Sequence, residues 1–129
     1  MNKILIEVSI GELLDKISIL EIKKDKIKDP NKLSFITDEL SKLKDELEKN
    51  VKSDAKLGEL FQSLKIINLR LWTIEDDKRQ FEKEKIFDEN FIKISRDVHI
   101  LNDDRAKIKL KINELTGSKI KEIKEYTSY

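Results

Sequence analysis

The chain has 129 residues, of which 41% are charged and 38% hydrophobic, and its 27 basic and 26 acidic residues leave a net charge of +1. This balance lacks the basic surplus of a dedicated nucleic-acid binder, and a chain with no cysteine and one histidine cannot form disulfides, iron–sulfur clusters, or thiolate or histidine-rich zinc sites. No apolar run approaches the ~18 residues of a membrane span, so we expect one cytoplasmic domain without membrane contact or cofactor.

Residues 1–8 predict an extended arm that leads into a helix. Ile4 to Val8 form a short β-prone run, and no later stretch offers a convincing second strand, although a partner subunit could supply one. Ser9 and Glu12 match the ends of a capping box, in which the serine hydroxyl accepts from a free backbone N–H and the glutamate reaches back. The first helix therefore begins here.

Two further helices follow. Asp29-Pro30 reads as an N-cap with proline at the first helical position. Apolar residues then recur at three- and four-residue spacing from Leu33 to Leu47, which is typical of an amphipathic helix. Ser53-Asp54 marks the break before a third helix, which we expect to run to about Ile86.

A fourth helix is predicted after a turn at residues 87–90. Its seam runs from Phe91 to Leu115 in a regular alternating register, and Arg105 is the one charged residue in it. Gly117 fits the helix-ending position that requires positive φ, and residues 118–129 then form a C-terminal tail or a short last helix.

These elements predict a single all-α domain over residues 1–129, an antiparallel bundle of about four helices with coiled-coil-like spacing and long third and fourth helices. The helices carry apolar residues on more than one face; Ile19 and Ile22, for example, lie off the main stripe of the first helix. A single small chain would leave such surface uncovered, so we expect a homo-oligomer, with a dimer favoured.

Polar residues interrupt or flank the apolar seams of the two long helices, and their charges are complementary. At ~100° per residue, Asn68 and Glu75 fall inside the apolar arc of the third helix. Glu75 is expected to face inward from that helix and Arg105 from the fourth, while the first helix adds a glutamate and a lysine. The candidate site residues are Asn68, Trp72, Glu75, Arg79, Asn102, Asp103, Arg105, Lys109, Glu21 and Lys24.

Two interpretations of this polar seam stay open. In the first, the glutamate, arginine and asparagine side chains form a buried network that sets helix register or oligomeric state, a documented use of polar core residues. In the second, the cations of the set converge on a small anionic ligand, and Glu75 or Asn68 places a hydroxyl of that ligand.

A metal site is a third hypothesis. Glu75-Asp76-Asp77 and Asp103-Asp104 offer the carboxylate oxygens that Mg²⁺ prefers, and Glu12 and Asp15 lie one helical turn apart, as in the all-helical nucleotide pyrophosphohydrolases. The third helix does not repeat this spacing, because Arg79 occupies the next turn. Adjacent carboxylates more commonly form a solvated face, so we predict no metal ligands.

Three separated motifs resemble a known family. They are Ser9-x-Gly-Glu-Leu-Leu-Asp-Lys-Ile-x-Ile-Leu-Glu-Ile-Lys23, Asn68-x-x-Leu-Trp-x-Ile-Glu-Asp76 with Arg79 and Glu82, and Asn102-Asp-x-Arg-Ala-x-Ile-Lys109 with Ile112-Asn113. With a Lys/Glu-rich tail, they look like the small bacterial family catalogued as domain of unknown function 6165, over nearly the whole chain. The chain departs from that pattern at His99, where tyrosine is usual, and in the tail. The resemblance implies a helical fold without an assigned activity, and some relatives beside glycosyltransferase-type genes hint at surface-polysaccharide metabolism.

We therefore expect a non-catalytic cytoplasmic assembly or binding module with a polar network in its core. The alternative is a small enzyme or ligand-binding protein that acts on an anionic metabolite (a phosphate, carboxylate or sugar nucleotide) at the seam of the third and fourth helices. Dependence on a ligand separates the two, because a site loses binding when Arg105 alone is changed, whereas a structural network tolerates coordinated replacement of its charges.

Overall fold

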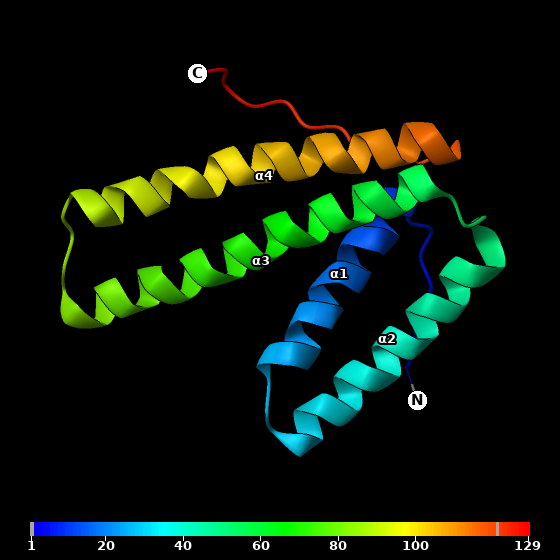
Figure 1. Cartoon of the computed structure of the whole chain (residues 1–129), viewed down its shortest axis with the longest axis horizontal. Coiled ribbons are helices and arrows are strands. Elements are labelled where there is room, and N and C mark those ends of the chain that lie inside the picture. Colours follow the sequence, from blue (N-terminus) through cyan, green and yellow to red (C-terminus); the bar gives the residue numbers. More distant parts are fainter. Residues whose placement is uncertain (1, 121) are drawn as a thin grey trace.

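The computed structural model describes residues 2–120 and 122–129, and its helices form an all-α antiparallel arrangement (Figure 1). In chain order they are α1 (Ile10–Lys26), α2 (Pro30–Asn50), α3 (Ala55–Glu84) and α4 (Glu89–Thr116). The predicted all-α bundle with long third and fourth helices is confirmed. Met1 of the predicted arm and Lys121 of the predicted tail lie outside the described residues.

Several helix ends follow the caps that the sequence predicts. Ser9 Oγ accepts a hydrogen bond from the backbone N–H of Glu12 at 3.0 Å, and Asp29 Oδ1 accepts one from Asn31 at 2.9 Å. The last helix ends at Gly117, whose φ of 66° lies in the left-handed region that favours glycine. Local capping chemistry therefore determines these ends.

By contrast, α3 ends at Glu84 with Lys85 in the left-handed conformation, and α4 begins at Glu89 after the N-cap Asp88, inside the turn predicted at residues 87–90. The Glu12 carboxylate of the predicted capping box pairs with Lys109 instead.

The four helices make two antiparallel hairpins, α1–α2 and α3–α4, which cross at an angle (Figure 1). Within the described residues, α1 alone packs against each of the other three helices, so it is the central helix of the fold. Toward its C-terminal end α1 diverges from α3, and the outer halves of α3 and α4 continue beyond it as a two-helix finger (Figure 1).

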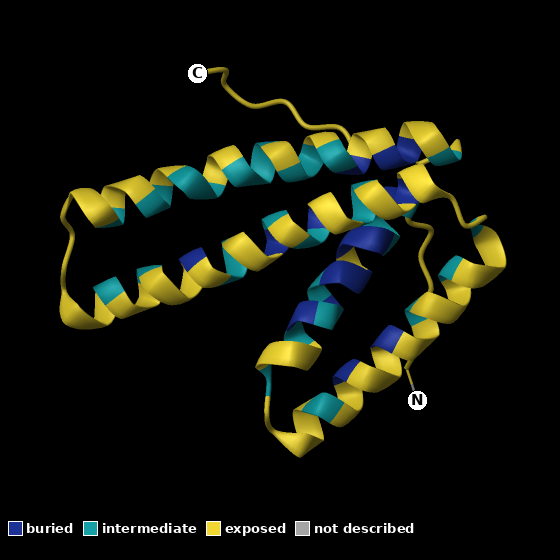
Figure 2. Cartoon of the chain, in the orientation of Figure 1, coloured by how far each residue is buried: buried dark blue, intermediate teal, exposed yellow. Residues whose placement is uncertain are grey.

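The hydrophobic core lies where α1 meets the other helices, and the finger is largely exposed (Figure 2). Its buried members are Leu14, Ile17, Leu20, Ile36, Leu40, Leu57, Leu64 and Ile112. Ile22 is also buried, at 2% exposure, although it does not belong to this cluster. The apolar surface of α1 that lies off its main stripe is therefore covered at Ile22 within the single chain, which differs from the expectation that one chain would leave such surface uncovered.

The arm and the tail flank the helices without regular secondary structure in their described parts. Three apolar side chains of the arm are almost fully solvated: Ile4, Leu5 and Ile6 are 87%, 91% and 76% exposed. The tail follows the outer side of α4 (Figure 1). Among the described residues, no helix combines the length and the apolar character that crossing a membrane requires.

Candidate functional site

A buried polar network centres on Asp15 of α1, which is 1% exposed. The Arg105 guanidinium of α4 donates to both carboxylate oxygens, from Nε to Oδ1 at 2.9 Å and from Nη2 to Oδ2. The Asn68 amide of α3 donates to Asp15 Oδ1 and to Ser18 Oγ, each at 2.8 Å. One carboxylate therefore connects three helices, and paired hydrogen bonds to a planar guanidinium also fix its orientation.

Lys109 of α4 forms a second cluster one helical turn beyond Arg105. Its ammonium nitrogen lies 2.7 Å from Glu12 Oε2, 2.7 Å from Glu122 Oε2 and 3.9 Å from Asp15 Oδ2. Lys109 is only 6% exposed, so its charge sits largely away from water. These carboxylates supply the pairing that a buried cation requires.

The first turn of α1 packs directly on the backbone of α4. The Gly11 N–H donates to Asn113 Oδ1 at 2.7 Å, and the Ile10 N–H donates to Ser118 Oγ at 3.3 Å. A Cβ at position 11 would lie 2.6 Å from the Lys109 carbonyl oxygen, so glycine permits this close approach. The side chains of Asn113 and Ser118 thus accept hydrogen bonds from backbone N–H groups in the first turn of α1, which have no partner within an isolated helix.

The pairing shifts the pKa of both cations upward. The hydrogen bond to Asp15 raises the pKa of Arg105 by more than partial burial lowers it. Burial is the largest single influence on Lys109 and lowers its pKa, but the hydrogen bonds to Glu12 and Glu122 together with Asp15 outweigh it. The same contact with Lys109 lowers the pKa of Glu122.

A family model described as "Family of unknown function (DUF6165)" matches residues 4–129. The chain belongs to this family. The DUF6165 match covers the arm from residue 4, the helices α1 to α4 and the tail, and therefore every residue of the polar network. No curated protein and no solved structure matches the chain.

The structure brings four predicted site residues of this DUF6165 chain together. Asn68, Arg105 and Lys109 gather around Asp15, and Asn102 accepts from Arg105 Nη1 at 3.3 Å. Residues from two separated sequence motifs, Asn68 in one and Arg105 and Lys109 in the other, therefore belong to one network.

Two other predicted residues, Asp103 and Trp72, do not take part in the hydrogen bonds of the network described here. Asp103 faces the tail and accepts from the Tyr129 hydroxyl at 2.7 Å, while the Tyr129 ring meets His99 edge to face with centroids 5.1 Å apart. Trp72 is half-buried on α3. The tail is thus attached to α4 at two places, here and at Lys109.

The prediction that Glu75 faces inward opposite Arg105 is wrong. The Glu75 side chain is 52% exposed and lies 4.0 Å from Arg79, whose own side chain is 81% exposed. Glu75 follows Asn68 on one line of α3. Asn68 is hydrogen-bonded to Asp15 and Ser18 of α1, but α1 diverges from α3 toward its own C-terminal end (Figure 1). The same helix face is therefore buried at one position and solvated two turns later.

The two predicted residues of α1 also lie outside the network. Lys24 is exposed near the end of the helix. Glu21 is half-buried and pairs with Lys65 at 3.2 Å and Lys44 at 3.9 Å. The predicted convergence of Arg105, Lys109, Lys24 and Arg79 is therefore found only for the first two.

Sequence reasoning missed the face of α1 that makes the network. Gly11, Asp15, Ser18 and Ile22 are all buried and recur at four-, three- and four-residue spacing. This is the spacing of a helix seam, but its members are mostly small or polar, so a search for apolar residues passes over it. The helical spacing of these four positions was the sequence feature that could have revealed this face.

The carboxylates considered for a metal do not gather. Among residues 2–120 and 122–129, no group of three or more His, Cys, Asp or Glu side chains is placed to hold a metal ion. The oxygens of Asp15 accept from Asn68 and Arg105, and Glu12 pairs with Lys109.

Acid should weaken the attachment of the tail to α4 at Lys109. Because the folded-state pKa of Glu122 lies below its ordinary value of 4.5, the stabilisation from its contact with Lys109 is fully present above that value and is lost as pH falls through the folded-state pKa. We expect heteronuclear NOE values of tail amides to drop in that acidic range. Glu122→Gln should lower them already at neutral pH, and the exposed-residue control Glu125→Gln should not. Tail amides equally ordered in wild type and Glu122→Gln at pH 7 would contradict this attachment.

Proposed function

We propose that this DUF6165 chain is a non-catalytic cytoplasmic assembly module whose polar core holds two helical hairpins in one relative geometry. The observation that carries the proposal is the charge pairing within the chain: Arg105 is paired with Asp15, and Lys109 with two glutamates. An anion-binding site needs cations that are left for the ligand, whereas these are already neutralised and hydrogen-bonded.

The solvated apolar side chains support an assembly role. Several large ones are more than half exposed, and they occur on the arm, on three helices and at the α3–α4 turn: Ile4, Leu5, Ile6, Phe35, Ile66, Phe87 and Ile92. Isolated exposed apolar residues are ordinary, but a continuous run such as that in the arm is typical of a surface that contacts another protein.

A second candidate is binding of a small anionic metabolite under the tail. A cavity of about 670 Å³ lies between the tail and α4, and its lining includes His99, Asn102, Lys124 and Tyr126. Because Asn102 accepts from Arg105, a ligand in this cavity would act on the edge of the network. This observation favours a ligand-binding protein or small enzyme at the α4 side of the predicted seam.

A thermal-shift panel separates these functions. Wild type, Arg105→Met and the control Arg96→Met, an exposed arginine on the same helix, would be heated with Mg²⁺, nucleotides, sugar nucleotides and small dicarboxylates. A ligand at one hundred times its dissociation constant adds about 2.7 kcal/mol, which moves the midpoint by several degrees. If the assembly proposal is correct, each compound should shift the unfolding midpoint of all three proteins by the same amount.

A different response of Arg105→Met alone would contradict the proposal. A compound that stabilises wild type and Arg96→Met but not Arg105→Met would overturn the assembly proposal and assign the polar seam to ligand binding. The second candidate would then be tested by measuring turnover of that compound.

A further inference from the structure

Positive charge collects at the connection between α1 and α2. Residues 23–32 hold two aspartates and five lysines, namely Lys23, Lys24, Lys26, Lys28 and Lys32. This segment therefore carries a net charge of +3, and because the whole chain carries +1, the rest of the chain sums to −2. A chain that is nearly neutral overall is thus basic at this turn.

The turn projects from the molecule. It joins the last turn of α1 to the first turn of α2, at the end of that hairpin that points away from α3 and α4 (Figure 1). Lys24, Lys26, Lys28 and Lys32 are exposed, and Figure 2 shows the same end of the hairpin as largely exposed. The C-terminus of α1 and the N-terminus of α2 carry opposite partial charges, so the two helix dipoles offset each other here and leave the charge of the lysines.

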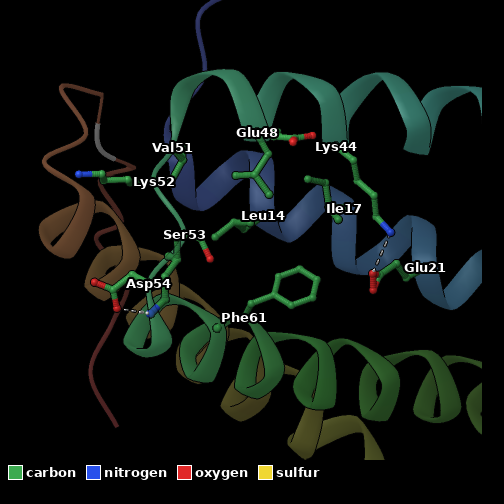
Figure 3. Close-up of a pocket in the computed structure, with 13 residues that line it drawn as sticks. Leu14, Ile17, Glu21, Lys44, Glu48, Val51, Lys52, Ser53, Asp54 and Phe61 are labelled. Carbon is green, nitrogen blue, oxygen red and sulfur yellow. Dashed lines mark hydrogen bonds and ion pairs between the residues drawn. The ribbon is translucent and has the colours of Figure 1, made fainter.

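These lysines are not paired within the part of the chain that the structure describes, where none of the five forms a salt bridge. Lys28 Nζ donates to the backbone carbonyl of Asp25 at 3.3 Å, which leaves its charge unneutralised. A lysine farther along the hairpin behaves differently: Lys44 reaches across the groove between α1, α2 and α3 to Glu21, at 3.9 Å (Figure 3). The turn therefore offers cations that are free for an external anion.

An exposed aromatic ring lies beside this charge. Phe35 is 79% exposed and follows Lys32 by three positions on α2, which makes the two side chains neighbours on the helix surface. Ile36 and Leu40 form the buried stripe of α2, and Phe35 lies outside it. Lysines that reach lipid head groups beside a ring that reaches the acyl boundary are typical of helices that lie on a membrane surface.

We propose that residues 23–35, called the lysine tip below, bind reversibly to the surface of a membrane that contains anionic lipid. The lysines contact the head groups, and Phe35 enters the boundary with the acyl chains. This inference goes beyond the assembly function and does not depend on it. It differs from the expectation of no membrane contact, which followed from the lack of a spanning segment, because peripheral contact requires no such segment.

The extent of the basic surface favours a bilayer over a nucleic acid. A nucleic-acid binder carries a basic groove or stripe that follows the phosphate backbone. Here acidic residues return at Asp38 and Glu39, one helical turn beyond Phe35, and the rest of the chain is net negative. A flat anionic surface meets only the projecting tip, since charges more than about 8 Å away are screened at physiological salt.

Sedimentation with lipid vesicles tests the proposal. The full wild-type chain should bind vesicles of phosphatidylcholine mixed with phosphatidylglycerol, bind pure phosphatidylcholine vesicles more weakly, and leave the mixed vesicles in high salt. Each lysine near an anionic surface contributes roughly a factor of five to the partition coefficient. Lys24→Gln/Lys28→Gln/Lys32→Gln should therefore lower the partition coefficient about 100-fold.

The matched control removes the same charge elsewhere. Lys83→Gln/Lys107→Gln/Lys111→Gln replaces three exposed lysines of α3 and α4, and its partition coefficient should stay within about threefold of wild type, because screening confines the attraction to nearby charges. Both triple variants change solvated side chains, so their circular dichroism should match that of wild type.

Phe35→Trp reports the position of the ring. Mixed vesicles should shift its emission to shorter wavelength, and brominated acyl chains should quench it, whereas the emission of wild type, which comes from Trp72 alone, should not change. Phe35→Ser should lower the partition coefficient about tenfold. Ile66→Ser, at an apolar position of α3 that is 67% exposed, should leave it unchanged.

Each contrary result overturns the proposal. Wild type that stays in solution with mixed vesicles at low salt has no such anchor, and equal losses in the two triple variants would assign binding to overall charge. A Phe35→Trp spectrum that the vesicles leave unchanged would exclude contact of the ring with lipid. Wild type that binds an RNA oligonucleotide but not the vesicles, with binding lost in Lys24→Gln/Lys28→Gln/Lys32→Gln, would assign the tip to nucleic acid instead.

Discussion

Arg105→Met should lower the free energy of unfolding by about 3–5 kcal/mol, because it removes one partner of a buried ion pair and leaves the other. Asp15, at 1% exposure, would retain the Asn68 amide and the more distant Lys109 ammonium at 3.9 Å. Neither replaces the paired hydrogen bonds of a guanidinium. Urea unfolding followed by the fluorescence of Trp72, the one tryptophan of the chain, measures this loss.

A companion variant tests the cause of that loss. Asp15→Asn/Arg105→Met removes both charges and keeps an acceptor oxygen for the Asn68 amide, so it should recover more than half of the lost stability. Arg79→Met is the matched control, since its side chain is 81% exposed and its ion pair with Glu75 is solvated; its effect should stay within about 0.5 kcal/mol. Arg105→Met as stable as wild type would contradict the pairing described for Asp15.

Capping chemistry made several helix ends predictable from the sequence, but not the end of α3 at Glu84 or the start of α4 at Glu89. Ser9, Asp29 and Gly117 act within one or two turns of their own position, and each occupies the role that its residue type predicts. The apolar seams of α3 and α4 were readable for the same reason, because helical periodicity is a local property.

The sequence does not predict which side chains pair within the network, because these pairs depend on how the helices cross. Asn68 and Glu75 share one line of α3, and periodicity treats them alike. Only the divergence of α1 places the first in the core and the second in water. Likewise, nothing local distinguishes Asp15 from the other acidic residues as the partner of Arg105, which lies 90 positions away. Crossing angle and packing decide these contacts, and both are properties of the assembled fold.

Gly11→Ala should destabilise the protein by roughly 2–4 kcal/mol, although alanine is the better helix former. The new Cβ would stand 2.6 Å from the Lys109 carbonyl oxygen and 2.9 Å from Asn113 Oδ1. The nearer atom is backbone and cannot rotate away, so α1 must move off α4. That movement stretches the buried 2.7 Å hydrogen bond from the Gly11 N–H to Asn113 and loosens the pairing around Asp15.

Gly58→Ala supplies the control for this prediction. Gly58 lies in the first turns of α3, and a Cβ there would meet nothing within 4 Å, so alanine should stabilise the helix by up to about 1 kcal/mol. Urea unfolding of the two variants should therefore give effects of opposite sign. If both substitutions stabilise the protein, α1 and α4 do not approach at Gly11. If only Gly11→Ala is destabilising, the lack of a side chain at position 11 is what allows α1 to approach α4 closely enough for Asp15 to bind Arg105. The polar network then depends on glycine at this position as well as on its charged residues.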